Sequence, residues 1–224
     1  LEKVKSALEL GKSARSIGLG EEEMDQNCQN DGALYFYGTS TGSSYIGGIV
    51  GFTLKPSGVS TCTNNGAIYM DGSNGAAGYI GGIIGYTANG GTITDLHNRG
   101  DITVAGLNKN VNASGIGAIS GTNEITNSSS ICNLKSISPD LNLGMFNGYA
   151  ATGARKVSNS QVGGTIQRVG DEAPVTITTE NFKNYLFSGN ASYIAAEGTN
   201  YENITVVDAS AGDDNTAGED TTTQ

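Results

Sequence analysis

The sequence has few of the residues from which metal sites and most catalytic sites are built. It contains three cysteines and a single histidine among 224 residues, and no two cysteines have C-x-x-C spacing. The H-E-x-x-H pattern of many metalloproteases is also absent. We therefore expect no metal site, no cofactor and no metalloprotease activity in this chain.

Positive charge and long apolar runs are scarce as well. The chain has 12 basic residues against 22 acidic ones, which gives a formal net charge of −10. Binding to nucleic acid or to anionic lipid needs Lys and Arg, so we expect neither partner. No apolar run approaches the ~20 residues of a membrane-spanning helix, so we do not expect an integral membrane protein.

Glycine, in contrast, is abundant with 34 residues, and many glycines belong to two repeated phrases. The first phrase occurs four times with decreasing fidelity, at Tyr45–Gly51 (YIGGIVG), Tyr79–Gly85 (YIGGIIG), Gly115–Gly121 (GIGAISG) and Leu143–Gly148 (LGMFNG). The second phrase occurs at Cys28–Leu34 (CQNDGAL), Cys62–Ile68 (CTNNGAI) and Leu96–Ile102 (LHNRGDI). Its period is 62 − 28 = 34 and 96 − 62 = 34 residues, which is typical of solenoids, propellers and arrays.

The composition of each repeat favours strands over helices. Short runs of Ile, Val, Tyr and Thr alternate with Gly and Asn, and no repeat has the length or pattern of an amphipathic helix. A propeller blade needs about 40–45 residues, which is longer than this period. We therefore predict an all-β protein, a right-handed parallel β-helix of about four to five coils, with a β-propeller as the main alternative.

In such a β-helix, equivalent residues of successive coils stack along the axis, so the repeats predict continuous ladders. We expect three apolar ladders: Ile46, Ile80, Ile116 and Leu143; Ile49, Ile83, Ile119 and Phe146; and Leu34, Ile68 and Ile102. Asn30, Asn64 and Asn98 should form a polar ladder whose amides hydrogen-bond along the axis. The cysteines Cys28, Cys62 and Cys132 should share one inward position with Leu96 and Ser160, as buried thiols without a disulfide.

These phrases resemble the GLUG-motif repeat, which was named from IgA-peptidase-like bacterial surface proteins. The repeat also occurs in surface lipoproteins and adhesins of Gram-negative gut anaerobes. The resemblance covers about residues 24–170, although Ala118 and Ser120 depart from the pattern of the first two copies. It implies a surface β-solenoid, secreted or at the outer cell surface, and it implies no protease activity, because the peptidase domain of such proteins is a separate module.

The pattern along the chain divides it into four parts. Residues 1–20 should form a capping helix, because solenoid ends expose apolar core and unpaired strand edges. Residues 21–170 should form the β-helix, and residues 171–207 a small α+β cap with a short helix beginning near Thr178. Residues 208–224 contain mostly small and acidic residues, which predicts a disordered acidic tail.

Catalytic patterns in the sequence are weak. Gly38–Gly42 matches the nucleophile elbow G-x-S-x-G, but no helix is predicted to follow Ser40, as that elbow requires. The single histidine, His97, should be an exposed outward side chain. Asp95, Arg99 and Asp101 should form a salt bridge within a turn. We therefore expect a chain that is not an enzyme.

Tyrosines are the best candidates for binding. Tyr45 and Tyr79 should stack in register, and Tyr35, Tyr37 and Tyr69 lie on the preceding strands. A row of tyrosines on a β surface can pack against sugar rings, although aromatic residues also simply suit strands. We expect a non-catalytic, adhesin-like module that binds a glycan or a host surface protein. A carbohydrate-active β-helix enzyme, which needs paired carboxylates, and an accessory segment of an IgA-peptidase-like protein are the alternatives.

Overall fold

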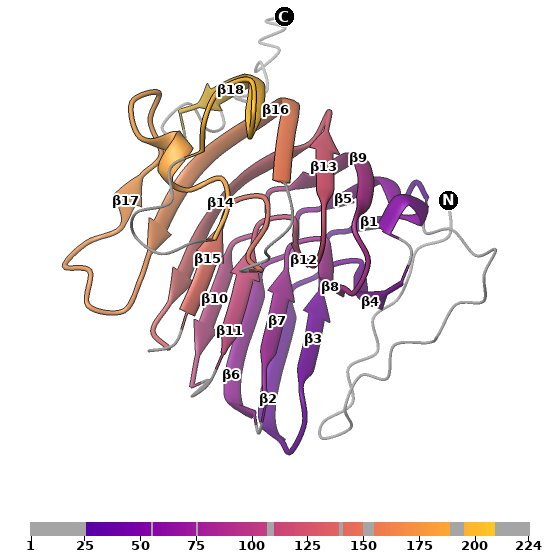
Figure 1. Cartoon of the computed structure of the whole chain (residues 1–224). Helices are drawn as coiled ribbons and strands as arrows, with labels where there is room; N and C mark the ends of the chain where they lie inside the picture. Colours follow the sequence, from indigo (N-terminus) through magenta and orange to yellow (C-terminus); the bar gives the residue numbers. More distant parts are fainter. Residues whose placement is uncertain are drawn as a thin grey trace, which may run out of the picture.

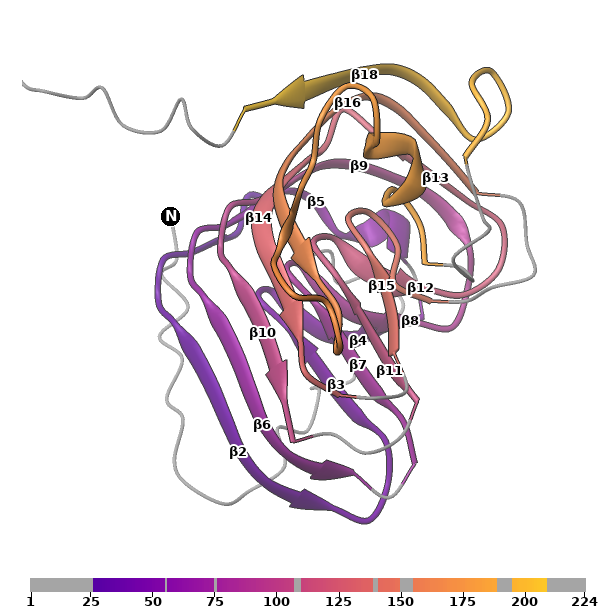
Figure 2. The same cartoon turned by 90° about the vertical axis from the view of Figure 1, so that its left-hand side faces the viewer.

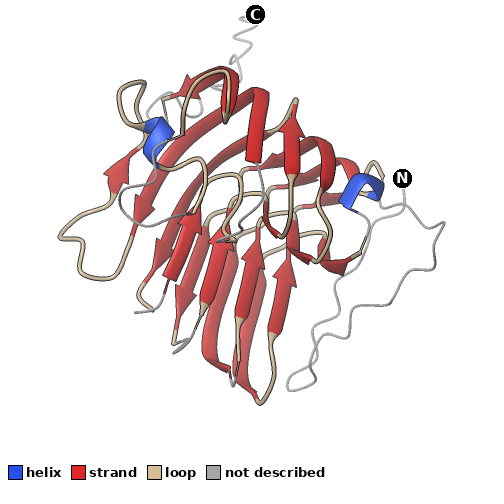
Figure 3. Cartoon of the chain, viewed as in Figure 1, coloured by secondary structure: helices blue, strands red, loops and turns tan. Residues whose placement is uncertain are grey.

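The computed structural model describes residues 26–54, 56–74, 76–106, 110–138, 141–149, 155–188 and 195–208. Regular structure within these residues is almost entirely β-strand, with two short 3₁₀ turns (Figure 3). The predicted helix over residues 1–20 and nearly all of the predicted acidic tail lie outside the described residues. No helix of the described part is long and apolar enough to cross a membrane.

The strands follow one another in coils. The first coil contains β1 (Gln29–Asn30), β2 (Leu34–Ser40), β3 (Ser44–Gly47) and β4 (Val50–Thr53), followed by the 3₁₀ turn η1 (Pro56–Gly58). The second contains β5 (Ser60–Asn64), β6 (Ile68–Asn74), β7 (Gly78–Gly81) and β8 (Ile84–Thr87). The third contains β9 (Gly91–Asn98), β10 (Ile102–Ala105), β11 (Val111–Ser114) and β12 (Gly117–Ile119). The fourth contains β13 (Asn123–Thr126), β14 (Ser129–Ser136) and β15 (Leu141–Gly144), and β16 (Arg155–Gln167) begins the next.

Strands at the same place in successive coils pair in parallel, which confirms the predicted β-solenoid (Figure 1). One sheet has the order β1-β5-β9-β13-β16-β14-β10-β6-β2, and the two smaller sheets have the orders β15-β11-β7-β3 and β12-β8-β4. Figure 2 shows β2, β6 and β10 on one side of an arm, with β3, β7 and β11 on its other side. Apolar side chains inside the coils form a continuous hydrophobic core, whose burial is the main force that holds the coils together.

The ladders that were predicted for the first two coils are confirmed. Ile46 pairs with Ile80, and Ile80 is completely buried. Leu34, Ile68 and Ile102 are also in register. Their ladder continues through Leu134 and Ile166, which the sequence analysis did not include.

The predicted register of the phrase at residues 115–121, in the third coil, is wrong. Ile80 pairs with Ala113 rather than with Ile116, and Ala113 pairs in turn with Leu143. The spacing is therefore 113 − 80 = 33 residues, where the sequence match suggested 36. The phrase at 115–121 resembles the earlier copies but begins too late to be their counterpart.

The second predicted ladder changes in the same way. Ile116 follows Ile83, because the backbone N–H of Ile83 donates to the Ile116 carbonyl oxygen over 3.1 Å. Ile119 pairs instead with Thr87, after a register shift within β12. The ladder therefore consists of Ile49, Ile83, Ile116 and Phe146.

The asparagine ladder is confirmed. The Nδ2 atom of Asn30 donates to Asn64 Oδ1 over 2.7 Å, and Nδ2 of Asn64 donates to Asn98 Oδ1 over 2.8 Å. Each amide also donates to a glycine carbonyl two residues further along the chain. These bonds satisfy amides that are fully buried in the second and third coils, where an unpaired polar group would be costly.

The Gly-Gly turn between β3 and β4, and its counterpart between β7 and β8, pack against this ladder. A Cβ atom built on Gly48 would lie 2.6 Å from Cγ of Asn64, and one built on Gly82 would overlap the side chain of Asn98. The interior is therefore pinched between the asparagines and the Gly-Gly turn. This close approach explains why glycine recurs in the repeated phrase.

A column of left-handed residues runs along the largest sheet. It consists of six residues with φ between 49° and 59°: Asn27, Thr61, Asp95, Asn127, Asn159 and Asn203. The strand pairs on either side place these residues above one another. Each of these residues interrupts the in–out alternation of side chains along its strand. Around Asp95, for example, Ile93 and Leu96 both face the core although they are three residues apart. Asn tolerates this conformation, whereas β-branched Thr61 is unusual in it.

The prediction for the cysteines is partly wrong. Cys62 pairs with Leu96, as expected, but the next residue in that ladder is Ser128, whose Oγ accepts a bond from the Leu96 N–H over 3.1 Å. Cys132 pairs with Gly164 instead. Cys28, Cys62 and Cys132, all in the described part of the chain, form no disulfide. Burial raises the pKa of Cys132 to about 12, so its thiol stays protonated.

The C-terminal segment adds β17 (Val175–Thr176), the 3₁₀ turn η2 (Phe182–Asn184) and β18 (Tyr201–Val207). The helix expected near Thr178 is only the single turn η2, because the Asn181 amide bonds to the backbone of Thr176 and Thr178 and bends the chain. β18 runs parallel to β16, and residues 185–188 bond to the backbone of residues 145–147. This segment therefore continues the stacking of the coils.

Candidate functional site

Five aromatic side chains meet outside the Gly-Gly turn, and we call them the corner cluster: Tyr45, Phe52, Tyr79, Tyr86 and Tyr149. Tyr45 on β3 and Phe52 on β4 lie on opposite sides of the turn, yet their ring centroids are only 5.3 Å apart. Two outward side chains can converge in this way only where the outer surface is concave. The turn that pinches the core therefore creates a corner on the outside.

The rings of the corner cluster pack mainly against one another. Tyr45 and Tyr79 are in register and stack with centroids 5.3 Å apart and planes within 7°. Tyr86 lies 4.4 Å from Tyr79, and Tyr149 lies within 6.0 Å of both. Only Tyr45 has as much as 36% of its surface exposed. Most ring faces are thus already in contact with other rings.

This packing changes the acidity of two partly buried tyrosine hydroxyls. Burial, followed by the neighbouring Tyr149, Tyr86 and Tyr45, raises the pKa of Tyr79 to about 12. Burial also raises the pKa of Tyr86, which a hydrogen bond with Ser120 partly offsets. Both hydroxyls therefore lose their protons only at a higher pH than an exposed tyrosine would.

The other three predicted tyrosines form a separate surface on the arm, and we call them the platform: Tyr35, Tyr37 and Tyr69. Tyr35 and Tyr37 alternate along β2, and their rings are parallel within 2° with centroids 6.3 Å apart. Tyr69 on β6 pairs with Tyr35, and its ring lies 6.4 Å and 5.8 Å from theirs. Tyr35 is 50% exposed and Tyr37 is 60% exposed, so the platform stays open to solvent.

Polar side chains adjoin the platform in the same sheet. Asp71 is in register with Tyr37, and Thr103 is in register with Tyr69. Lys135 follows Thr103 in the next coil. Asp71 and Lys135 are exposed. The surface therefore combines aromatic rings with a carboxylate, a hydroxyl and an ammonium group, which accept and donate hydrogen bonds.

The structure thus separates the five predicted tyrosines into two groups. Tyr45 and Tyr79 are in register, as predicted, but they lie in a concave corner rather than on a flat face. Sequence reasoning missed the other three members of the cluster. Phe52 and Tyr86 are 86 − 52 = 34 residues apart and could have been found by the period. Tyr149 has no counterpart in the repeats and left no such signal.

The elbow-like sequence around Ser40 is a turn between two strands. β2 ends at Ser40 and β3 begins at Ser44, so no helix follows. The Ser40 hydroxyl bonds to the backbone of Gly42 over 3.3 Å. This geometry lacks the strand-to-helix turn that a nucleophile elbow requires.

The histidine takes part in a chain of hydrogen bonds that the sequence analysis did not predict. His97 Nε2 lies 2.9 Å from Asp95 Oδ1, and Nδ1 lies 2.9 Å from Ser129 Oγ. The hydrogen bond from His97 is the main cause that lowers the pKa of Asp95. Ser129 is only 4% exposed, between the third and fifth coils, so its hydroxyl is not accessible to a substrate. The chain of bonds connects two coils.

The prediction of a salt bridge among Asp95, Arg99 and Asp101 is wrong. Among the described residues, no ion pair joins Arg99 to Asp95 or Asp101. Asp101 instead accepts bonds from the backbone N–H and side chain of Asn133 over 2.8 Å and 3.1 Å. The described residues also contain no group of three or more His, Cys, Asp or Glu that could hold a metal ion.

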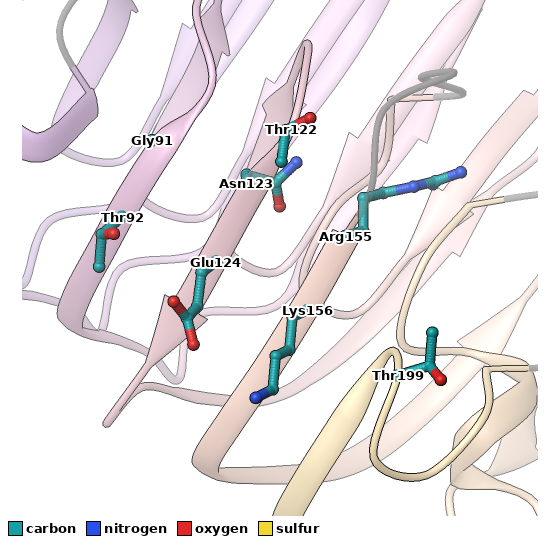
Figure 4. A pocket seen from close by; sticks show the side chains of 8 residues that line it. All are labelled: Gly91, Thr92, Thr122, Asn123, Glu124, Arg155, Lys156 and Thr199. Atoms are coloured by element: carbon teal, nitrogen blue, oxygen red, sulfur yellow. The ribbon is translucent and has the colours of Figure 1, made fainter.

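A shallow depression of about 410 Å³ lies elsewhere, over the starts of β9, β13 and β16 (Figure 4). The side chains that line it are mostly polar, and they include Thr92, Thr122, Asn123, Glu124, Lys156 and Thr199. Arg155 begins β16 beside it, but its guanidinium donates to the carbonyl oxygens of Tyr149 and Ser188. Arg155 therefore anchors the C-terminal segment. The sequence analysis selected no residue of this depression.

Comparison with known proteins gives no further assignment. No protein-family model, no curated protein and no solved structure matches the chain.

Proposed function

We propose that the chain is a non-catalytic, adhesin-like module that acts outside the cell, secreted or on the outer surface, and binds a glycan through the platform. The observation that carries this proposal is the exposure of Tyr35 and Tyr37 beside Tyr69 and Asp71. The resemblance of the repeated phrases to surface β-solenoids supports the location. A host surface protein that carries such a glycan is the natural partner.

The chemistry of the platform suits a sugar. The apolar C–H face of a pyranose ring packs well on an aromatic ring, and the sugar hydroxyls remain free for hydrogen bonds. The Asp71 carboxylate accepts such bonds, and the tyrosine hydroxyls both accept and donate them. Three rings with centroids between 5.8 Å and 6.4 Å apart offer contacts to more than one sugar unit.

Charge narrows the class of glycan. The chain carries a net charge of −10, and the exposed Asp71 carboxylate lies directly beside Tyr37, whereas the Lys135 ammonium group lies two strands beyond Tyr69. Like charges repel, so sialylated and sulfated glycans are disfavoured. A neutral glycan is the ligand that this surface accepts best.

A glycan array with neutral and acidic members, followed by calorimetry on the best neutral ligand, tests the proposal. The double variant Tyr35→Ala/Tyr37→Ala should weaken binding at least about tenfold, since each lost aromatic contact contributes roughly 1 kcal/mol. Leu54→Ala, which removes another exposed apolar side chain, is the matched control and should bind normally. Equal affinities of the double variant and the wild type would overturn the proposal.

A further inference from the structure

The stack of coils ends in an apolar surface at its first coil. Among the described residues, β2, β3 and β4 each pair with the second coil alone, so they stand at the ends of their sheets. Four inward side chains of this coil are partly exposed, although their counterparts in the second coil are at most 1% exposed. They are Leu34, Phe36, Ile46 and Ile49, and we call the surface that they form the open end.

Along the open end, β2 has no partner strand among the described residues. Alternate residues of a strand in a parallel sheet bond to the same neighbouring strand. The N–H of Leu34 donates to the Ala67 carbonyl oxygen over 2.8 Å, so the backbone groups of Tyr35 and Tyr37 point away from β6. The seven residues of β2 include no charged residue and no proline. Such an edge readily pairs with another chain, and natural proteins usually shield it.

At the other end of the stack, a segment of the chain itself shields the core. Residues 185–188 bond to the backbone of residues 145–147, and Phe146 is completely buried. A segment of the chain is within reach of the open end as well. Gln26, the first described residue, forms a bridge with Ser60, so residues 1–25 are joined directly to the first coil.

The sequence of residues 1–20 matches the open end in length and in apolar pattern. A helix of 20 residues would be about 30 Å long, which exceeds the length of about 23 Å that the seven residues of β2 span. Leu1, Val4 and Leu8 have the spacing of one helix face. Such a segment can lay apolar side chains along the whole open end.

Charge favours this segment over a second copy of the chain as the occupant of the open end. Residues 1–20 contain four basic and two acidic residues, which gives a net charge of +2. The rest of the chain contains 12 − 4 = 8 basic and 22 − 2 = 20 acidic residues, which gives −12. Opposite charges attract the segment to the stack, whereas two copies with a net charge of −10 each repel one another.

We propose that residues 1–20 of the same chain bind to the open end, with Leu1, Val4 and Leu8 packed on the exposed side chains of the first coil. The contact buries the end of the core and stops β2 from pairing with another chain. The general need of solenoids for capped ends predicts a cap, and the open end identifies the surface that it shields. This inference does not depend on glycan binding by the platform.

Amide hydrogen exchange, followed by NMR on the full chain, tests the proposal. In Val4→Gln/Leu8→Gln, the N–H of Leu34 should exchange about tenfold faster, because a first coil without its cover opens more often. The N–H of Ile68, which donates to the Asp101 carbonyl oxygen one coil further in, is the internal reference and should change little.

Ser6→Gln/Ser13→Gln is the matched control, since it introduces the same two side chains on the opposite side of the expected helix. Faster exchange of the Leu34 N–H in the first variant alone supports the proposal. Equal exchange rates of this group in the wild type and the first variant overturn it, and light scattering then shows whether a second copy covers the open end. Equal acceleration by both variants also overturns it, because the apolar face would not be the one that binds.

Discussion

The corner cluster and the platform use the same residue type at repeated positions, but they differ in what their rings touch. In the corner, Tyr79 is surrounded by Tyr45, Tyr86 and Tyr149, with centroids 4.4–6.0 Å away. On the platform, Tyr37 is 60% exposed. The difference lies in the local shape of the backbone. A concave surface directs outward side chains toward one another, whereas the open face of a sheet leaves them to solvent.

This comparison shows that a repeated aromatic residue has no fixed role in a solenoid. Tyr45 and Tyr79 stabilise the bend that the Gly-Gly turn produces, because their rings fill the outer side of that bend. Tyr35 and Tyr37 contact Tyr69 of the next coil, but at least half of each side chain stays exposed, so they contribute less to stability. Rings that contribute little to stability yet stay together on the surface are those available for a ligand.

The largest effect should come from removing the bend itself. In Gly82→Ala, the new methyl group would overlap the Gly115 carbonyl oxygen and the Asn98 side chain, so we expect a loss of about 3 kcal/mol in the free energy of unfolding. Urea denaturation measures this loss. Gly42→Ala, in the turn between β2 and β3, is the matched control, since nothing lies within 4 Å of the added atom. Equal stability of the two variants would contradict the pinched interior.

Removing single rings should lower the stability of the protein more in the corner cluster than on the platform. Tyr79→Ala removes a ring that packs against three others, and we expect it to destabilise the protein by about 2 kcal/mol. Tyr37→Ala should change the stability by no more than about 0.5 kcal/mol, as is usual for exposed positions. Both values come from urea denaturation under identical conditions. A larger loss for Tyr37→Ala than for Tyr79→Ala would reverse our assignment.

Alkaline pH should lower the stability of the folded protein through Tyr79, by less than the loss of the whole ring does. The pKa of Tyr79 is raised from 10.0 to about 12 in the folded state, so the folded chain holds this proton more tightly than the unfolded chain. The resulting stability is fully present below pH 10 and is lost as the pH rises toward 12. Denaturation of the wild type and of Tyr79→Phe across this range measures the effect. If both lose stability in parallel, the Tyr79 hydroxyl is not the cause.

The smallest expected effect is the loss of glycan affinity when a single platform hydroxyl is removed. Tyr37→Phe keeps the ring and removes only one hydrogen-bonding group, so we expect glycan affinity to fall about threefold or less. Calorimetry with the neutral ligand from the array measures it. A loss as large as that of Tyr37→Ala would mean that the hydroxyl, and not the ring face, makes the main contact.

The sequence alone predicted the architecture because the stacking of coils preserves residue type where side chains touch. Ile46 and Ile80, or Asn30, Asn64 and Asn98, repeat because like side chains pack or hydrogen-bond with like. The prediction of register from repeated residue types failed in the third coil, where a similar phrase recurs but the length of the coil changes. The phrase around Ile116 is displaced by three residues from its expected place, although it looks like a copy.

The surfaces were harder to predict, for a different reason. The sequence marked Tyr35 and Tyr79 equally, because exposure depends on the curvature of the backbone and not on the residue. Asn123 and Thr199 meet at the depression only because segments distant in sequence are stacked side by side. Asn and Thr are common in strands and turns of this chain, so neither residue carried a signal of its own.

The column of left-handed residues has a consequence for how such a chain can evolve. Its members are separated by 61 − 27 = 34, 95 − 61 = 34, 127 − 95 = 32, 159 − 127 = 32 and 203 − 159 = 44 residues. Coils of 32, 34 and 44 residues therefore return to the same point before the next one starts. Insertions and deletions elsewhere in a coil leave the left-handed residue in place. The loops outside the sheets can therefore change in length, or accept grafted segments, while the coils stay aligned.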